Sequence, residues 1–271
     1  MLIQNNSDAE KRFKFGLNWK DYLKSINESR ILVAEQSLIS KLGSVEGKTF
    51  LDIGSGSGLF SLAASRLGAK VVSFDYDSES VECTKHLKKI SEVDDRSWQV
   101  RSGSILDEEF IRSLGTFDIV YSWGVLHHTG EMWSALENAC ALKNDQGKLF
   151  IALYNDQGFR SRFWLRIKRL YVSGILGRYL VNATFIPFFF IQNAIFSIVT
   201  RRNIFRDYRS KRGMSIIHDW IDWLGGYPFE VAPPGDVVDF LLQRQLYLHS
   251  IKVNCGHGCT EYVFAPAKHT V

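Results

Sequence analysis

Two groups of residues in this chain have the types and the spacing that chemistry requires. The first is the glycine-rich turn Gly54–Gly58, which follows the apolar run Thr49–Ile53 and precedes a helical pattern. Glycines let the backbone bend sharply and approach a ligand closely, and the following helix offers unpaired N–H groups at its start. The second is the pair His127 and His128, because imidazoles titrate near neutral pH and suit proton transfer.

The spacing of the glycines discriminates among nucleotide-like ligands. A dinucleotide fingerprint reads G-x-G-x-x-G, whereas here Gly58 comes one position early and Leu59 stands where that pattern requires glycine. Asp52, two residues before Gly54, would repel a phosphate but would attract an ammonium group. S-adenosylmethionine carries an ammonium group and no phosphate, so the turn favours this ligand over a dinucleotide.

A second acid follows at the expected distance. The apolar run Lys70–Asp75 ends in a carboxylate 17 residues after Gly58, close to the ~20-residue offset of an acid that binds ribose hydroxyls. Tyr76 comes next and is placed to flank an adenine ring.

Together these residues resemble the class I S-adenosylmethionine-dependent methyltransferases, whose first motif reads acid-x-G-x-G-x-G and whose second strand ends in a ribose-binding acid. Phe117–His128 is similar to that family's fourth strand and the loop after it, and Gly147–Tyr154 to its fifth strand. Within the family, the chain most resembles small-molecule O-methyltransferases of ubiquinone biosynthesis and of natural-product sugars. The resemblance covers residues 45–155 well and the last 40 residues moderately.

The resemblance implies S-adenosylmethionine as the cofactor and a set of residues that bind it. These residues lie before the core, in the glycine turn and after the second, third and fourth strands. They are Trp19, Asp52, Gly54, Ser55, Gly56, Gly58, Leu59, Asp75, Tyr76, Ser104, Ile105, Ser122, Trp123 and Gly124.

The resemblance also implies the catalytic residues. In related sugar O-methyltransferases, a His-His pair with an acid after the fifth strand is thought to supply the base, and His127, His128 and Asp156 match these places. The alternative is that one histidine packs against the cofactor and only the other faces the substrate. In either case we expect a base that titrates near pH 6 to 7. The expected substrate-binding residues are Tyr154, Asn155, His218, Trp220 and Tyr227.

The alternation of strands and helices predicts an α/β fold with a doubly wound, Rossmann-like sheet. Helices are expected at Ser25–Leu42, Leu59–Leu67 and Ser78–Ile90. After Tyr154 the pattern breaks, and a last helix-strand-strand unit is expected at Pro233–Gln245, Tyr247–Val253 and Thr260–Ala265. The predicted organisation is N-terminal cap helices in 1–44, a cofactor-binding core in 45–157, a helical insertion in 158–232 and the end of the core sheet in 233–271.

Charge is divided along the same boundaries. Between Gly158 and Gly213 there are twelve basic residues and a single acid, Asp207, so this insertion is near +11 and the rest of the chain near −7, although the net charge is +4. Basic clusters attract phosphates on nucleic acid, on lipid or on a phosphorylated substrate.

The insertion also contains Tyr179–Thr200, 22 residues without a charge, with Arg178 before it and Arg201 and Arg202 after it. About 20 apolar residues can cross a bilayer, but polar residues and Pro187 interrupt this run. Three interpretations remain: a membrane span, a pair of buried lid helices over the active site, or an element that lies in an anionic membrane surface. A contact with a second copy of the chain, as in a homodimer, is a further use of the same run.

The sequence shows no signal-peptide pattern at its N-terminus, which favours a cytoplasmic location, at the inner membrane face if the interfacial interpretation holds. No metal is expected, because Cys255 and Cys259 with His257 between them lack a second ligand pair. The expected function is methylation of a hydroxyl on a small-molecule, glycan-linked or lipid-linked acceptor. The alternatives are an RNA-modifying methyltransferase and a protein that binds S-adenosylmethionine without catalysis.

Overall fold

The framework of the protein is a seven-stranded sheet with the strand order β3-β2-β1-β4-β5-β7-β6. The structure is a computed structural model, and it describes residues 12–13, 19, 23, 26–201, 216–254, 256 and 258–267. The strands are β1 Thr49–Ile53, β2 Lys70–Asp75, β3 Trp98–Ser102, β4 Phe117–Trp123, β5 Lys143–Leu153, β6 Tyr247–Lys252 and β7 Thr260–Ala265.

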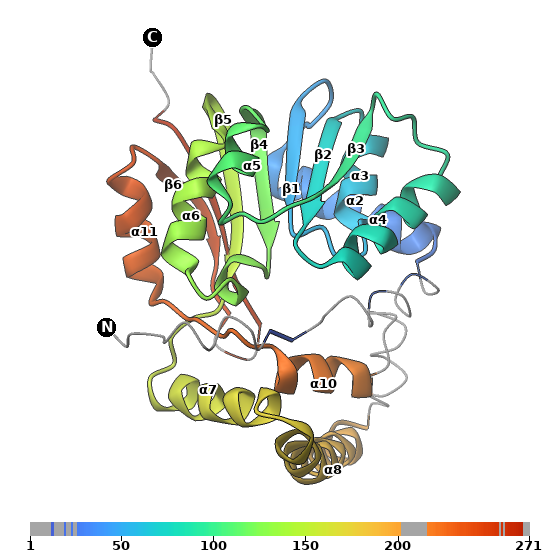
Figure 1. Cartoon of the computed structure of the whole chain (residues 1–271), viewed down its shortest axis with the longest axis vertical. Coiled ribbons are helices and arrows are strands. Elements are labelled where there is room, and N and C mark those ends of the chain that lie inside the picture. The colour runs from blue at the N-terminus through green and yellow to red at the C-terminus, as the bar shows by residue number, and fades with distance from the viewer. Residues whose placement is uncertain are drawn as a thin grey trace.

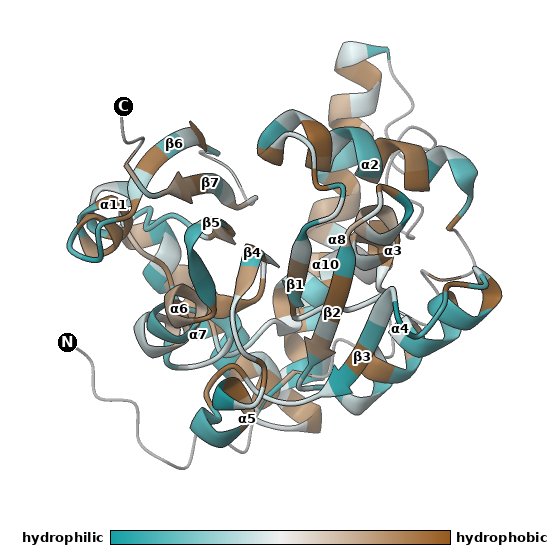
Figure 2. Cartoon of the chain, turned by 90° about the horizontal axis from the view of Figure 1, so that it is seen from above, coloured by the Kyte–Doolittle hydropathy of each residue, from teal (hydrophilic) through white to brown (hydrophobic). Residues whose placement is uncertain are grey.

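The sheet is parallel except at β7. β1 pairs in parallel with both β2 and β4, while β7 runs antiparallel between β5 and β6. Helices cover both faces (Figure 2): α2 Glu28–Leu42, α3 Leu59–Arg66 and α4 Ser78–Ile90 on one face, and α5 Glu108–Arg112, α6 Met132–Ala141 and α11 Pro234–Leu242 on the other. This arrangement confirms the predicted α/β, doubly wound fold.

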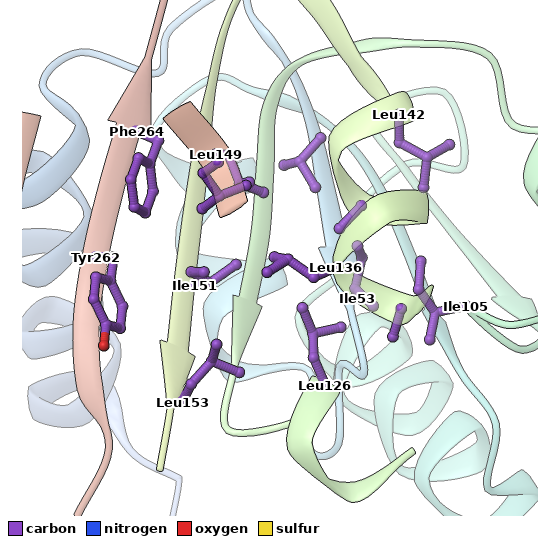
Figure 3. Packing of buried hydrophobic residues seen from close by; sticks show 14 of the residues in the cluster. Ile53, Ile105, Leu126, Leu136, Leu142, Leu149, Ile151, Leu153, Tyr262 and Phe264 are labelled. Carbon is purple, nitrogen blue, oxygen red and sulfur yellow. The ribbon is translucent and has the colours of Figure 1, made fainter. Parts of the chain in front are cut away.

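The two faces of the sheet carry separate apolar clusters because side chains alternate along a strand. In β5, Leu149 and Ile151 join the cluster under α6 and α11, while Phe150 joins the cluster under α2 and α3. Figure 3 shows Leu149 and Ile151 beside Leu136 of α6 and Tyr262 of β7. Strands that are buried on both faces read as continuous apolar runs, which is why β5 was visible in the sequence.

Between β5 and α11, the described residues form the helices α7 Phe159–Val172, α8 Ile175–Thr200 and α10 Ile216–Gly225. They lie across the edge of the sheet toward which β4 and β5 point, with α7 and α10 nearer the sheet and α8 outermost (Figure 1). They share a small apolar cluster around Tyr171, Val181, Phe189 and Leu224.

The structure corrects one interpretation of the uncharged run. It forms one continuous helix, α8, and not a pair of buried lid helices, and Pro187 lies inside this helix without ending it. The packed side is a stripe at four-residue spacing, with Gly177, Val181 and Phe189 buried. Ile175 and Ile198, which lie off the stripe, are 89% and 77% exposed. The run is uncharged and mostly apolar, but the protein buries only a narrow side of it.

The core packing predicts a large cost for truncating Leu136, which is fully buried between α6 and the sheet. Leu136→Ala should lower the free energy of unfolding by about 2–5 kcal/mol, because lost transfer energy and the residual cavity add. Chemical denaturation measures this change. The matched control is Leu32→Ala on α2, whose side chain is exposed, and which should cost less than about 1 kcal/mol. Equal losses in the two variants would contradict the described packing.

Candidate active site

The glycine turn connects the end of β1 to α3 at the carboxyl edge of the sheet. Gly54, Gly56 and Gly58 have φ of 74°, 54° and 80°, a region that favours glycine. A Cβ on Gly54 would lie 2.4 Å from Cγ2 of Val125, and one on Gly58 would lie 3.0 Å from Cγ2 of Thr84. The predicted turn therefore needs glycine both for its backbone angles and for its close neighbours.

Asp75 lies at the end of β2, directly beside this turn. Its carboxylate accepts hydrogen bonds from the backbone N–H of Gly56 at 3.0 Å and of Asp77 at 2.9 Å. Burial raises the pKa of Asp75 from 3.8 to about 6, although these hydrogen bonds act in the opposite direction. A desolvated carboxylate at this edge fits the predicted partner of two ribose hydroxyls.

Asp52 lies behind the turn. It is 3% exposed, and its carboxylate accepts a hydrogen bond from Oγ of Ser61 at 2.5 Å. Burial, and to a smaller extent the charge of Asp75, raise the pKa of Asp52 to about 7. The contact between Asp52 and an ammonium group stays a prediction, to which the structure adds that the carboxylate is already held by α3.

Two of the predicted aromatic residues lie at the turn. The indole of Trp19 covers Gly56, since a Cβ on that glycine would lie 2.8 Å from Cε2 of Trp19. Tyr76 is 65% exposed, and the guanidinium carbon of Arg12 lies 5.0 Å from the centroid of its ring. Trp19 thus lies against the turn, and Tyr76 follows directly after the ribose-binding candidate Asp75.

Several other predicted cofactor residues have structural partners for their side chains. Ile105 and Leu59 belong to the core clusters. Oγ of Ser122 donates to the carbonyl of Ile53 at 3.3 Å, and Nε1 of Trp123 donates to Glu261 at 3.2 Å. The remaining members are Ser104, whose Oγ accepts from the N–H of Leu106, Ser55, whose Oγ bonds Oγ1 of Thr84, and Gly124, with φ of 75°. Three of these side chains are buried in the protein: those of Ile105, Leu59 and Ser122. Such residues could contact a cofactor only through their backbone groups.

The histidine pair lies in the short 3-10 helix η2, Leu126–His128, directly after β4. Nδ1 of His128 is 2.6 Å from the carbonyl oxygen of Pro228. A carbonyl accepts only, so Nδ1 carries the proton and the lone pair of the neutral ring is on Nε2. His127 is fully buried, and neither of its ring nitrogens has a hydrogen-bond partner among the described residues.

Burial disfavours the charged form of both imidazoles. Burial lowers the pKa of His128 to about 3 and the pKa of His127 well below 6.5, and the charge of Lys168 lowers both further. The expectation of a histidine that titrates near pH 6 to 7 is therefore wrong for the protein without ligands, because desolvation opposes the imidazolium form.

Asp156 does not join the pair. It is exposed, and its carboxylate accepts a hydrogen bond from the N–H of Gly158 at 2.8 Å, which caps the turn before α7. No hydrogen bond or ion pair joins it to either histidine in the described part of the chain. The predicted role of Asp156 beside the base is therefore not supported by its position.

Lys168 is a site residue that the sequence analysis missed. It comes from α7, is fully buried, and its ammonium donates to the carbonyl of Trp223. Its Nζ lies 4.2 Å from the centroid of the Trp223 ring and 4.9 Å from that of Phe229. Burial lowers the pKa of Lys168 to about 7, while Asp222 raises it.

A signal for Lys168 was present in the sequence. Ser161, Trp164, Lys168 and Tyr171 follow one another at intervals of three or four residues, so a helix places them on one face. In α7, three of these four side chains are buried. Counting Lys168 only as one of twelve basic residues hid its position on the apolar face.

A pocket of about 320 Å³ lies between β5, α7 and the segment after α10. Its lining combines four aromatic rings with polar groups: Tyr154, Asn155, Gln157, Arg160, Ser161, Trp164, Trp223, Phe229 and Gly256. The Tyr154 ring lies 4.0 Å from the His127 ring and 5.7 Å from the His128 ring, between centroids. Oδ1 of Asn155 is buried without a hydrogen-bond partner among the described residues. The pocket therefore adjoins the histidines and contains an unsatisfied acceptor.

Of the predicted substrate-binding residues, Tyr154 and Asn155 line this pocket. Tyr227 is instead buried, with its carbonyl accepting from the N–H of Phe13 at 3.0 Å. Trp220 packs on Phe189 of α8, with ring centroids 5.6 Å apart. The side chain of His218 lies outside the described residues, as do Cys255 and His257.

Comparison with known proteins agrees with this geometry. Residues 28–209, more than half of the chain, match the family described as methyltransferase domain. The chain is 27% identical over 184 residues to the ubiquinone biosynthesis O-methyltransferase of Coxiella burnetii, covering 65% of this chain and 74% of that protein. It is 27% identical over 140 residues to the mitochondrial enzyme of the same name from Bos taurus, covering 49% of this chain and 37% of that protein.

Solved structures show the same fold. Magnesium protoporphyrin IX methyltransferase from Synechocystis PCC 6803 with bound SAH has a TM-score of 0.56 at 12% identity, over 93% of this chain and 94% of that one. A SAM-dependent methyltransferase from Aquifex aeolicus has a TM-score of 0.51 at 14% identity, over 92% and 98%.

The seven-stranded sheet and the glycine turn thus define a class I methyltransferase, with S-adenosylmethionine as its cofactor. The chain belongs to the methyltransferase domain family. The turn fits this cofactor by its glycine cradle, the carboxylate of Asp75 and the indole of Trp19. These groups would hold the nucleoside, and the cofactor supplies a methyl group bonded to a sulfonium sulfur.

The position of Asp75 predicts a pH-dependent affinity for S-adenosylmethionine. The carboxylate must lose its proton to accept hydrogen bonds from both ribose hydroxyls, so affinity should rise with pH through about 6. Asp75→Asn should remove the part of the rise near pH 6 and weaken binding by about 1–3 kcal/mol at pH 8. Calorimetry across pH 5 to 8 measures both effects.

Asp95→Asn is the matched control, because Asp95 is exposed and its pKa is lowered by Lys88. It should bind the cofactor like the native protein at every pH. A folded Asp75→Asn variant with native affinity would refute the ribose assignment.

Proposed function

We propose that this protein transfers the methyl group of S-adenosylmethionine to a hydroxyl of a small-molecule, glycan-linked or lipid-linked acceptor, with His128 as the base. The observation that carries the proposal is the hydrogen bond between Nδ1 of His128 and the carbonyl of Pro228. It orients the ring and leaves the lone pair on Nε2. The His128 ring lies 5.7 Å from the ring of Tyr154, which lines the pocket, between centroids.

The proposed step conserves the charge of the site. Nε2 of His128 takes the proton of the acceptor hydroxyl as the acceptor oxygen forms a bond to the methyl carbon. The bond between carbon and sulfur breaks, and its electron pair stays on sulfur. The site loses the positive charge of the sulfonium as His128 gains one. The imidazolium therefore forms without an increase in net buried charge, which reduces the desolvation cost that lowers the pKa in the free protein.

The pocket suggests the character of the acceptor. Its four aromatic rings favour an acceptor with an apolar, flat portion. Oδ1 of Asn155 can accept a hydrogen bond from a further donor on the acceptor, and Arg160 at the pocket lining is exposed and favours an anionic group. The curated relatives named as ubiquinone biosynthesis O-methyltransferases support transfer to oxygen.

The function is tested by incubating the full chain with methyl-labelled S-adenosylmethionine and with aqueous and organic-solvent extracts of cells. Label in an alkali-stable small product that mass spectrometry identifies as a methyl ether supports the proposal. Label lost on ribonuclease treatment would indicate RNA modification. Label on nitrogen or carbon would contradict transfer to oxygen, and cofactor binding without any labelled product would indicate a protein without catalysis.

His128→Asn provides the sharpest test of the base. An Asn side-chain amide can still donate to the carbonyl of Pro228 but has no group at the place of Nε2. We expect kcat to fall by about 10² to 10⁴ with the affinity for S-adenosylmethionine nearly unchanged. The control is His86→Asn on α4, away from the pair, which should leave kcat unchanged. Full activity in His128→Asn would remove this histidine from the mechanism.

The titration of Lys168 predicts how kcat depends on pH. Its pKa of about 7 means that it loses its charge as pH rises through 7, which removes a cation near both histidines and makes His128 a better base. We therefore expect kcat to rise through pH 7 and Lys168→Met to remove this rise, with a higher rate than the native enzyme at pH 6. A kcat profile from pH 5.5 to 9 measures this.

Arg169→Met is the control on the same helix, because Arg169 is exposed, and it should keep the native profile. Lys168→Met leaves the carbonyl of Trp223 without this donor, so a loss of about 1–3 kcal/mol in stability is expected as well. A profile that still rises through pH 7 in Lys168→Met would assign the titration to another group.

A further inference from the structure

The outer side of α8 is a long apolar surface that the protein leaves uncovered. Exposed apolar side chains lie in its first two turns and again from Phe188 to its last turn: Ile175, Leu176, Tyr179, Leu180, Phe188, Phe190, Ile191, Ile195, Phe196, Ile198 and Val199. Scattered exposed apolar residues are normal, but a contiguous patch of this kind marks an interaction surface. In length and composition, α8 would be able to cross a membrane.

The charged residues of α7 and α8 have one sign only. Residues 158–201 contain seven basic residues and no acid. Six of the seven are exposed, and the exception is Lys168 in the active site. Arg178 and Arg201 lie near the two ends of α8, and the others lie on α7: Arg160, Arg162, Arg166 and Arg169.

We propose that α8 is a docking surface for a lipid bilayer that contains anionic lipid. The helix lies in the plane of the membrane surface, with its outer apolar side among the acyl chains. The arginines of α7 and of the ends of α8 contact the phosphates of the headgroups. The proposal is independent of the identity of the methyl acceptor.

Charge complementarity selects a bilayer over a second copy of the chain. Two copies joined through α8 would bring two sets of exposed arginines together, with no acid between Asp156 and Asp207 to pair them. Like charges that approach during burial of an apolar surface are costly. A headgroup layer offers hydrocarbon and negative charge at the same place, as this surface requires.

The packing of α8 selects a position along the surface over a span. Gly177 near the start of the helix and Phe189 beyond its middle are both buried, and α7 and α10 both contact α8. A span would have to separate this stripe from the Trp164, Trp220 and Tyr171 side chains that pack on it or beside it. An in-plane helix keeps every one of these contacts.

The helix that carries the docking surface contacts the acceptor pocket through its opposite, packed side. Trp164 lines the pocket and packs on Phe185 and Phe189 of α8, with ring centroids 5.5 Å and 6.2 Å apart. Trp164 also contacts Trp223, another residue of the pocket lining, with ring centroids 5.8 Å apart. α8 therefore contacts a residue of the pocket lining through its packed side, while its outer side is the one that would meet the bilayer.

The test is flotation of the purified full chain with vesicles of phosphatidylcholine alone or with 30 mol% phosphatidylglycerol. We expect binding to the anionic vesicles at 50 mM salt, and weaker binding to neutral vesicles or at 500 mM salt. Arg178→Glu with Arg201→Glu should reduce the partition coefficient by at least about 25-fold, since each lost basic residue accounts for about fivefold. The control is Arg96→Glu with Arg112→Glu, which changes two exposed arginines outside the insertion.

The apolar contribution is tested by Leu176→Gln, Ile191→Gln and Ile198→Gln together, which should lower binding by roughly tenfold or more. The control changes three exposed apolar residues on other helices, Val33→Gln, Ile39→Gln and Ile90→Gln, and should bind like the native protein. Affinity for S-adenosylmethionine verifies that each variant is folded.

Each other outcome overturns the proposal. Absence of vesicle binding with concentration-dependent dimerisation that the three glutamines abolish would assign the surface to a second copy. Resistance of bound protein to extraction by alkaline carbonate would indicate a span. Equal binding to neutral and anionic vesicles would remove the arginines from the interaction. Vesicle binding, salt dependence, carbonate extraction and the oligomeric state are all measured on the native protein, so only the assignment of a dimer contact to α8 uses a variant.

Discussion

The parallel pairing of β1 with β4 is the constraint on which the site depends. Backbone hydrogen bonds hold Asp52 opposite Tyr121, so both strands end at the same edge of the sheet. β2 and β3 extend to one side of this pair and β5 to the other, and ligands bind where the strand order reverses in this way. Because of this register, Val125 after β4 lies against Gly54 after β1. This register brings the start of the segment that carries the histidines against the cofactor turn.

The same edge concentrates ionisable groups that burial disfavours. Asp52 and Asp75 have pKa values above those of the unfolded chain, so the folded protein holds more protons between about pH 4 and 7 and its stability from these groups falls as pH rises in that window. Lys168 and His128 have lowered pKa values, and the stability from them rises with pH. Such opposed desolvation costs are typical of binding and catalytic sites. A cationic, hydroxyl-bearing cofactor supplies partners that the acids lack in the free protein.

The insertion completes the site and adds a surface. α7 supplies Lys168 and Trp164, and the segment after α10 supplies Phe229 and the carbonyl that orients His128. One side of α7 therefore belongs to the active site, while α8 lies beyond it (Figure 1) and exposes many of its apolar side chains. The insertion therefore lines the pocket with α7 and exposes an apolar helix, α8. A membrane bound at α8 would be a source of an apolar acceptor.

Short sequence patterns were sufficient to predict the fold and the cofactor of this protein. The glycines at positions 54, 56 and 58, the acid that ends β2 and the apolar runs of β4 and β5 are short-range patterns, so the doubly wound fold, the cofactor and the helices α4 and α11 followed from them. The bounds of α4 and β7 agreed residue for residue. Tertiary structure decided what depends on distant contacts. Burial, and not residue type, set the pKa values of His127 and His128, and it turned Lys168 from one basic residue among twelve into part of the site. It also left the outer side of α8 uncovered, because an all-round apolar pattern does not reveal which side the protein will cover.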